Sequence, residues 1–433
     1  MKNLKYFFLM LTVASLGIMS CGDDDSGPGA LAILTIEAAG TSFEDGTAVT
    51  KDLNGASSAT DVALNSVITI TFDKDVDAAT VNATNVSLAS SAGTIGATAT
   101  AAGAVVTITP DADMQRGTMY TLSVSGVAGG DGGVFVAVSR SFTTEGRAPV
   151  VVPNESALIA YWPFDGSADD ATGDYPADNV VAIDFGNDRF GQGNSTATFD
   201  GDESLIEVLN ADRLMAGNDL TISFWIKTNT NGHVNENGDP AGNFVFGLGA
   251  FFGFQFEIPA DISSCKLAAS YVSDNGNTWG EDLWFNGSGQ DNQNGGWQGW
   301  DFVADLTGTG GVASLLKDKW AHVVCTYNAS TKQGRMYING ELMKSQDFNL
   351  WPDMSNPRTC TGVNYRGVDT DVENILAFGF IKSADSPMWA DTPWGDYYKP
   401  TSNHFKGDLD DVRVFNAPFS ADDAKNLYNA EKP

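Results

Sequence analysis

Leu220-Thr221-Ile222-Ser223-Phe224-Trp225-Ile226 alternates polar and apolar side chains with a period of two, which is the pattern of a strand with one buried face. The runs 323–327 and 335–338 are also short and rich in residues that favour strands. After the second run, Asn339-Gly340 suits a two-residue turn in which both residues take positive φ. Many such segments, separated by Gly, Asn and Asp, predict an all-β sandwich rather than an α/β fold.

A series of seven short motifs extends over the C-terminal two thirds of the chain. It resembles the laminin-G-like, concanavalin A-type jelly rolls of bacteria, and the resemblance implies that residues 156–433 form one jelly-roll domain. That fold carries lectins, adhesion modules and glycosidases alike, so the resemblance predicts the fold better than the function. The motifs are Ala160–Gly166, Phe190–Gly193, Phe199–Gly201, Leu220–Ile226, Trp320–Val323, Met336–Gly340 and Phe405–Phe415.

Residues 31–145 have a different composition, rich in Ala, Thr, Val and Gly and without Trp. Alternating runs such as 67–72 and 105–110 predict about seven short strands. Their order resembles the bacterial Ig-like domains of cell-surface proteins, which implies a small Ig-like sandwich that acts as a spacer. Residues 146–155, with two prolines, are predicted to be a semi-stiff linker.

The end of the chain carries a helix signal. Residues 419–430 are predicted to form one closing helix, with Ser420 as the N-cap and Asp423 beside the positive end of the helix dipole.

Residues 1–20 are predicted to be a lipoprotein signal peptide. Lys2 and Lys5 precede an apolar run, 6–18, that is too short to span a bilayer. The run ends in Ile18-Met19-Ser20-Cys21, which resembles a bacterial lipobox and implies acylation of Cys21. A plain secretory signal is the alternative.

Residues 21–30 are predicted to be an acidic tether. The run Asp23-Asp24-Asp25 resembles the signal that directs lipoproteins to the cell surface in Bacteroidetes, although an acidic linker without an address is the alternative. The resemblance predicts a lipid-anchored protein of the outer membrane that faces the extracellular medium.

The charge of the chain limits its partners. It has 24 Lys and Arg against 55 Asp and Glu, a formal net charge of -31. This balance argues against binding nucleic acid or highly anionic polymers over a broad surface. A solvated acidic exterior, with some Asp used for calcium, accounts for it.

Tryptophan placement is the clearest functional signal. Trp162, Trp225 and Trp320 fall inside the motifs above and are predicted to be core residues. Others fall in two stretches rich in Asn, Gly and Asp, 273–311 and 383–404, which are predicted to be loops. Flat aromatic rings beside amides and carboxylates suit the apolar faces and hydroxyl rims of sugars, although long loops also need small cores of their own. The predicted ligand-binding residues are Trp279, Trp284, Trp297, Trp300, Trp389, Trp394 and Tyr397.

A structural calcium ion is a further expectation. Related sandwiches often hold calcium near the chain ends through Asp and backbone oxygens. The resemblance assigns this role to Asp165 and Asp170 in the first loop and to Asp410 or Asp411 in the last strand. Solvated aspartates in turns are the alternative.

The chain contains no catalytic motif that we recognise. Laminarinase-type members of the fold carry Glu-x-Asp-x-x-Glu on one strand, and this spacing is absent from the sequence. His322 is predicted to be a packed residue, and no Gly-x-Ser-x-Gly elbow accompanies it. Cys265, Cys325 and Cys360 allow one disulfide or three free buried thiols.

The sequence therefore predicts a non-catalytic surface lipoprotein that binds a polysaccharide or oligosaccharide through its jelly roll, as an accessory to glycan capture and uptake. The alternative is an adhesion or assembly subunit of a surface complex that binds protein. A glycoside hydrolase or lyase is the third possibility. The sequence does not indicate which glycan, which oligomeric state or which complex.

Overall fold

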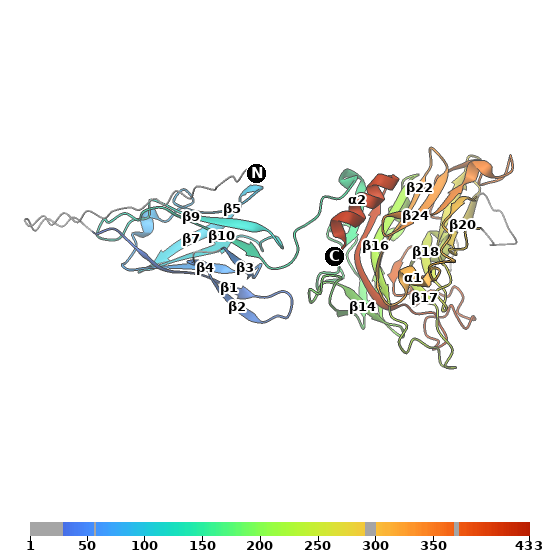
Figure 1. Ribbon diagram of the computed structural model, residues 1–433, viewed down its shortest axis with the longest axis horizontal. Helices are drawn as coiled ribbons and strands as arrows, with labels where there is room; N and C mark the ends of the chain where they lie inside the picture. The colour runs from blue at the N-terminus through green and yellow to red at the C-terminus, as the bar shows by residue number, and fades with distance from the viewer. Residues whose placement is uncertain (1–28, 56–57, 291–299, 368–371) are drawn as a thin grey trace, which may run out of the picture. The chain divides into compact units, whose positions relative to one another are not determined.

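The computed structural model describes residues 29–55, 58–290, 300–367 and 372–433, and residue 300 by its backbone alone. The predicted signal peptide, Cys21 and Trp297 lie outside these residues. The chain forms two separate compact units, each a β-sandwich (Figure 1). Within the described residues, no helix combines the length and apolar character needed to cross a bilayer.

The N-terminal sandwich consists of two five-stranded sheets. Its first sheet has the order β2 (Ala48–Asp52), β1 (Ile33–Thr41), β4 (Val67–Phe72), β8 (Val105–Pro110) and β7 (Ala97–Ala102). Its second has the order β3 (Ala59–Val62), β10 (Val138–Thr144), β9 (Met119–Val124), β5 (Val86–Ser90) and β6 (Gly93–Thr94). A 3-10 turn, η1 (Ala78–Thr80), connects β4 to β5.

The period-two alternation builds the core of this sandwich. In β4, Ile68, Ile70 and Phe72 are buried while the residues between them are half-buried. The described residues form ten strands rather than the seven or so predicted. The predicted number of strands was too low because runs such as β7 consist of Ala and Thr, whose small side chains give a weak apolar pattern. Strand β7 nevertheless pairs with β8 along its whole length.

The C-terminal sandwich consists of two larger sheets, here called sheet A and sheet B. Sheet A has the order β13 (Asp184–Phe185), β14 (Ala197–Asp200), β27 (Lys406–Phe415), β16 (Leu220–Thr228), β22 (Trp320–Asn328), β23 (Gln333–Ile338), β24 (Glu341–Asp347) and β21 (Trp300–Val303), and β11 (Leu158–Trp162) also pairs with β27. Sheet B has the order β12 (Asn179–Val181), β15 (Leu205–Val208), β26 (Leu376–Phe378), β17 (Asn243–Leu248), β18 (Phe254–Ile258), β19 (Cys265–Ser273) and β20 (Thr278–Phe285), and β25 (Cys360–Val363) also pairs with β19.

Helical segments of the C-terminal sandwich are short, apart from one. They are η2 (Glu155–Ala157), η3 (Ala211–Met215), η4 (Ala250–Phe252), α1 (Ala313–Leu316), η6 (Phe348–Leu350) and the closing helix α2 (Ala421–Glu431). Helix α2 lies beside sheet A (Figure 1), and Ala424 and Leu427 pack there against Val324 and Phe415.

The main core lies between sheets A and B. Alternate residues of β16, such as Phe224, point into it and meet Phe246 and Phe256 of sheet B at ring-centroid distances of 5.0 Å. Trp225 points to the opposite face, beneath α2, and is 2% exposed. Both Trp162 and Trp225 are buried as predicted, but Trp320, at the start of β22, is only half-buried.

Local sequence signals correctly predicted a hairpin, a tight turn and the N-terminus of helix α2. Strands β22 and β23 pair as the predicted hairpin. Asn339 and Gly340 both have positive φ, 53° and 76°. Ser420 caps α2, its side chain accepting from the backbone N–H of Asp423 in a capping box. These predictions are confirmed because each depends on a few neighbouring residues.

The cysteines of the described residues are free and buried. The Cys265 thiol lies 3.6 Å from the sulfur of Met336, and burial raises its pKa to about 12. The Cys360 sulfur accepts a hydrogen bond from the Tyr327 hydroxyl at 3.0 Å. Of the two alternatives, the structure therefore shows thiols that act as small core side chains.

Candidate functional site

The outer face of sheet B is polar where β18, β19 and β20 meet. In β18, Phe254, Phe256 and Ile258 point into the core, so Gln255 and Glu257 lie on the outer face. Leu267 and Ala269 of β19, and Leu283 and Phe285 of β20, likewise belong to the core. The residues between them therefore face outward, because successive side chains of a strand point to opposite faces.

The strand register brings these outward residues together in rows. Glu257 pairs with Lys266, and Lys266 pairs with Trp284. In the next row, Gln255 pairs with Ala268, and Ala268 with Asp282. A third row holds Ser270 and Gly280. Antiparallel partners lie about 4.5–5.5 Å apart at Cβ, so each row forms one continuous surface.

Part of this face is covered by the segment that follows β26. Phe380, Ile381, Met388 and Tyr397 pack onto outward residues of β15, β17 and β26 and form a second small core. This is the loop core that long loops need. The cover ends beside β18, and a cleft begins there.

The cleft has a volume of about 400 Å³ and is lined by both apolar and polar groups. Trp284 supplies a half-buried aromatic ring, and Phe244 and several small residues supply further apolar surface. The polar lining includes Glu257, Lys266, Ser264 and two asparagines, Asn243 and Asn403. A concave surface with few, converging polar groups is typical of a small-ligand site.

Lys266 lies between two carboxylates. Its Nζ is 2.9 Å from Oε1 of Glu257 and 3.1 Å from Oδ2 of Asp282, and the three side chains are 22–25% exposed. Burial lowers the pKa of Lys266, but the two carboxylates outweigh it and raise the pKa above its usual value. Gln255 holds the other oxygen of Glu257, at 2.9 Å. The charged groups of the cleft are thus fixed in place before any ligand arrives.

The two asparagines at the cleft are also fixed. The side-chain carbonyl of Asn243 accepts from the backbone N–H of Lys406 at 3.2 Å, and that of Asn403 accepts from Gly242 at 3.0 Å. Both amide groups therefore have defined orientations. Planar amides held in this way can exchange hydrogen bonds with ligand hydroxyls.

The structure separates the predicted ligand-binding residues of 273–311. Trp279 and Trp284 lie on strand β20 rather than in a loop, and Trp300 begins β21. Trp284 lines the cleft, whereas Trp279 packs against Tyr271 and Phe348, at 5.7 and 6.1 Å, on the main core. Among the tryptophan side chains of this stretch that the structure describes, Trp284 lines the cleft and Trp279 does not.

The predicted residues of 383–404 lie on the cover of sheet B. Trp389 and Trp394 contact each other at 5.1 Å, and Trp394, 41% exposed, also meets Phe244 at the cleft. Tyr397 is buried in the small core, and its hydroxyl donates to the backbone oxygen of Glu203 at 2.6 Å. Tyr397 also borders a second cleft of about 330 Å³, together with the exposed Tyr398.

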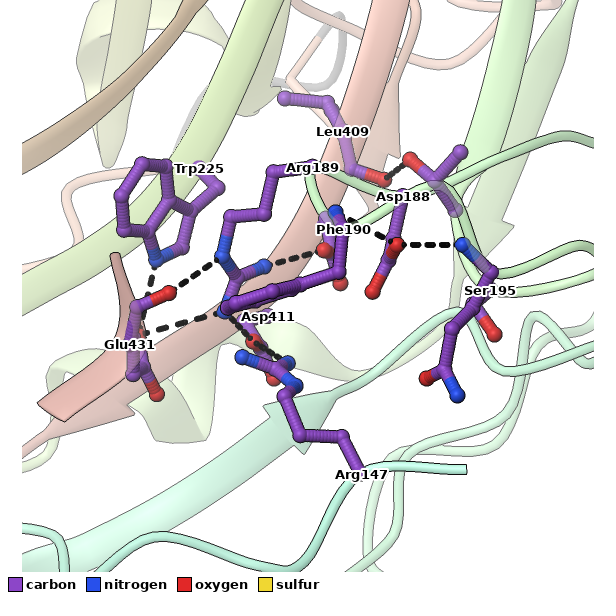
Figure 2. Close-up of polar contacts among 12 residues, drawn as sticks. Arg147, Asp188, Arg189, Phe190, Ser195, Trp225, Leu409, Asp411 and Glu431 are labelled. Carbon is purple, nitrogen blue, oxygen red and sulfur yellow. Dashed lines mark hydrogen bonds and ion pairs between the residues drawn. The ribbon is translucent and has the colours of Figure 1, made fainter. Parts of the chain in front are cut away.

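Asp410 and Asp411, two of the predicted calcium ligands, lie in a buried cluster of charges. Figure 2 shows Asp411 in this cluster beside Arg189. Arg189 forms ion pairs with Asp410 and, at 2.6 Å, with Asp411, and its Nε donates to the backbone oxygen of Glu431 at 2.8 Å. Arg413 bridges Asp411 at 3.0 Å and Glu431 at 2.8 Å. Both aspartates are therefore neutralised by guanidinium groups.

A bulge in β27 allows two successive aspartates to reach the same arginine. Asp411 has a φ of 50°, and the pairing of β27 with β16 shifts between Ser223 and Trp225. Such a bulge turns a side chain that would otherwise point to the other face. Burial and the adjacent Asp411 raise the pKa of Asp410, whereas Arg413, Arg189 and Arg147 overcome burial and lower the pKa of Asp411.

The four predicted calcium ligands do not fit a common cation. Asp410 and Asp411 are surrounded by arginines, which repel a cation. Asp170 instead organises its own loop, accepting from the backbone N–H groups of Tyr161, at 2.6 Å, and Tyr175, at 3.2 Å; Asp165 lies in the loop after β11. In the described part of the chain, no group of three His, Cys, Asp or Glu is placed to hold a metal. Calcium binding stays a prediction that these residues do not support.

His322 is inaccessible, as predicted for a packed residue. It is 0% exposed, and its Nε2 lies 2.9 Å from the Ser223 hydroxyl. Burial lowers its pKa to about 3, so the ring is neutral at physiological pH. Because Ser223 is also fully buried, no substrate can reach this Ser–His pair.

Sequence reasoning missed most of the cleft. The sequence patterns singled out none of Glu257, Lys266 and Asp282. The signal that could have found them is the alternation of Phe254-Gln255-Phe256-Glu257-Ile258, which places two polar residues on the face opposite the core. Their convergence with Asp282 depends on the pairing of β18, β19 and β20, which periodicity does not reveal.

Comparisons with known families identify both sandwiches. Residues 47–144 match the model of a bacterial Ig-like domain, and residues 200–373 match that of the concanavalin A-like lectin/glucanases superfamily. The chain contains a bacterial Ig-like domain followed by a concanavalin A-like domain. No curated protein matches it.

The chain is also similar to solved structures, with which it shares little sequence identity. One is the botulinum neurotoxin serotype D ligand binding domain in complex with N-acetylneuraminic acid, with 15% identity, 64% of this chain and 51% of that chain covered, and a TM-score of 0.38. Another is the botulinum neurotoxin type G receptor binding domain, with 16% identity, 63% and 51% covered, and a TM-score of 0.35. The chain spans about half the length of these structures. At these values the likenesses carry no information on ligand or site.

Proposed function

We propose that the concanavalin A-like domain binds a polysaccharide or oligosaccharide without cleaving it, and that the cleft on sheet B is the binding site. The single observation that carries this proposal is the placement of Trp284 beside the fixed Glu257–Lys266 pair in one cleft. A sugar ring stacks its apolar C–H face on an aromatic ring and directs its hydroxyls to charged or amide groups beside it. Asn243 and Asn403 extend this polar lining.

The geometry of the acids supports binding rather than hydrolysis. Glycoside hydrolysis needs one carboxyl group as a proton donor and a second as a base or nucleophile. Glu257 and Asp282 instead both form ion pairs with the same ammonium group, Nζ of Lys266. We therefore expect bound glycan to be released unchanged.

Replacement of Trp284 by alanine tests the site. We expect the affinity for a bound glycan to fall at least tenfold, about 1.4 kcal/mol, because the stacking surface is lost. The midpoint of thermal unfolding should change little, since the ring is only half-buried at the cleft. The glycan is first found by screening the purified protein on a broad panel, with reducing ends assayed in parallel.

Trp279→Ala is the matched control on the same strand. Because Trp279 packs on the main core, its loss should lower the unfolding midpoint and leave glycan affinity unchanged. The opposite pattern, with Trp284→Ala destabilising the protein and sparing affinity, would remove the cleft as the site. Binding of protein surfaces but of no glycan on the panel would favour the adhesion or assembly function, and new reducing ends would favour an enzyme.

We further propose that the protein acts at the cell surface as an accessory to glycan capture and uptake, anchored in the outer membrane by a lipid on Cys21. The lipobox at 18–21 and the acidic run 23–25 support this location. Protease added to intact cells should digest the protein. Survival on intact cells, with digestion after lysis, would exclude display on the outer surface.

A further inference from the structure

Arg366 lies on the outer face of sheet B, where its guanidinium is next to Gly280. Its guanidinium carbon lies over the rings of Phe251 and Phe252, 5.1 and 4.8 Å from their centroids. Among the described residues no carboxylate forms an ion pair with it, and its buried Nε has no hydrogen-bond partner. Arg189 and Arg413, by contrast, are both paired with carboxylates in the same domain.

Several contacts hold Arg366 in this position. Its backbone N–H donates to the carbonyl of Phe252 at 2.9 Å. Gly280 leaves the space that the guanidinium occupies, because a Cβ at that position would lie 3.0 Å from Nη2 of Arg366 and 3.2 Å from the Phe251 ring. The strand partner of Gly280 is Ser270, whose hydroxyl is fully buried and has no hydrogen-bond partner among the described residues.

The guanidinium of Arg366 is half-buried and has no carboxylate partner among the described residues. Burial disfavours the charged form and lowers the pKa of Arg366. The chain has 55 acidic residues, yet none of those described neutralises this guanidinium. Guanidinium groups bind carboxylates and sulfates with two parallel hydrogen bonds, and such charge-assisted bonds are about twice as strong as neutral ones.

The surroundings of Arg366 indicate what kind of anion fits. Phe251 stacks on Trp389 at 5.8 Å, so the arginine lies at the edge of an aromatic surface. An acidic sugar offers both an anionic group and an apolar ring face. We propose that Arg366, held over Phe251 and Phe252, is a binding site for the carboxylate or sulfate group of an acidic sugar.

This site is distinct from the cleft but lies on the same face. Gly280 and Trp284 lie four positions apart on β20, about 13 Å along the strand, a distance that an oligosaccharide can span. The net charge of -31 disfavours the binding of extended polyanions. Binding of a single anionic substituent at Arg366 is compatible with this charge. Binding at Arg366 does not require the cleft to be occupied, so the two proposals can fail independently.

The direct test follows the arginine side-chain resonances of the whole protein by NMR, with selectively labelled arginine. The probes are glucuronate, galactose 6-sulfate and, as the neutral control, methyl glucoside. We expect one resonance, absent from Arg366→Gln, to shift saturably with at least one acidic probe and not with the neutral sugar. The two acidic probes distinguish carboxylate from sulfate as the preferred group.

Two variants and one control sharpen the result. Gly280→Ala should weaken the affinity of Arg366 for the acidic probe, because the added methyl group would lie 3.0 Å from Nη2 and shift the guanidinium. Arg213→Gln is the control, since Arg213 also lies over an aromatic ring, 4.7 Å from Tyr175, but donates to backbone oxygens; it should leave the titration unchanged. Trp284→Ala should also leave it unchanged.

Three results would overturn the proposal. One is the absence of a saturable shift at Arg366 with either acidic probe. Another is an equal shift with methyl glucoside, which would show stacking without anion recognition. The third is an equal affinity for inorganic sulfate, which would show a general anion site without sugar preference.

Discussion

Trp225→Ala is expected to lower the free energy of unfolding of the concanavalin A-like domain by about 3–5 kcal/mol, the usual cost of truncating a large buried aromatic side chain. Trp225 is 2% exposed, and its indole N–H donates to Glu431 at 2.8 Å. The guanidinium carbon of Arg189 lies 4.3 Å from the centroid of its ring, and the ring of Tyr428 in α2 stacks on it at a centroid distance of 5.9 Å. The substitution therefore opens a cavity and leaves the Glu431 carboxylate with fewer donors.

Denaturant titration followed by tryptophan fluorescence measures this effect without interference from the other domain. Residues 31–145 contain no Trp, so the intrinsic signal reports the concanavalin A-like domain. Trp284→Ala removes the same side chain from a half-buried position and should change the unfolding free energy much less. Equal losses for the two variants would show that α2 does not seal the Trp225 site.

Arg189→Met is expected to cost about 3–5 kcal/mol, because it leaves buried carboxylates without their counter-charge. The Arg189 side chain is 0% exposed and pairs with Asp410 and Asp411, and its Nε also holds the last turn of α2 through the backbone oxygen of Glu431 (Figure 2). Methionine keeps much of the volume, so the loss reports charge and hydrogen bonds rather than a cavity. The same fluorescence titration measures it.

A double-mutant cycle with Asp410→Asn separates the ion pair from general disruption. In the native background Asp410→Asn removes a partner of Arg189 and should destabilise the domain. In the Arg189→Met background it removes a carboxylate that has lost its partner, so it should cost less or restore stability. Strictly additive effects of the two substitutions would argue against their coupling.

The sequence alone determined the fold class and the local elements. The alternation in 220–226 predicted strand β16, the pair Asn339-Gly340 predicted a tight turn, and Ser420 predicted the start of α2. Each of these features depends on interactions within a few residues, and such interactions can be read from order and spacing. The family resemblance rested on the same local motifs and was confirmed for both domains.

The candidate site was only partly predictable. Tryptophan placement predicted ligand binding for both Trp284 and Trp279. Both residues lie on β20, but of the two only Trp284 lines the cleft. Which tryptophan is core and which is accessible depends on the face that each presents. The composition of 273–311 indicated loops, so strand β20, which determines the face on which each tryptophan lies, was not predicted.

Tertiary structure alone decided which charges meet. Lys266 lies between Glu257 and Asp282 because three strands pair in one register, and a shift of one residue would turn each side chain to the other face. Asp410 and Asp411 meet Arg189, more than 200 positions away in the chain, so they form ion pairs where the sequence predicted a calcium site. Sequence pattern records periodicity along one strand, whereas an electrostatic site depends on the distances between strands, which only the folded sheets define.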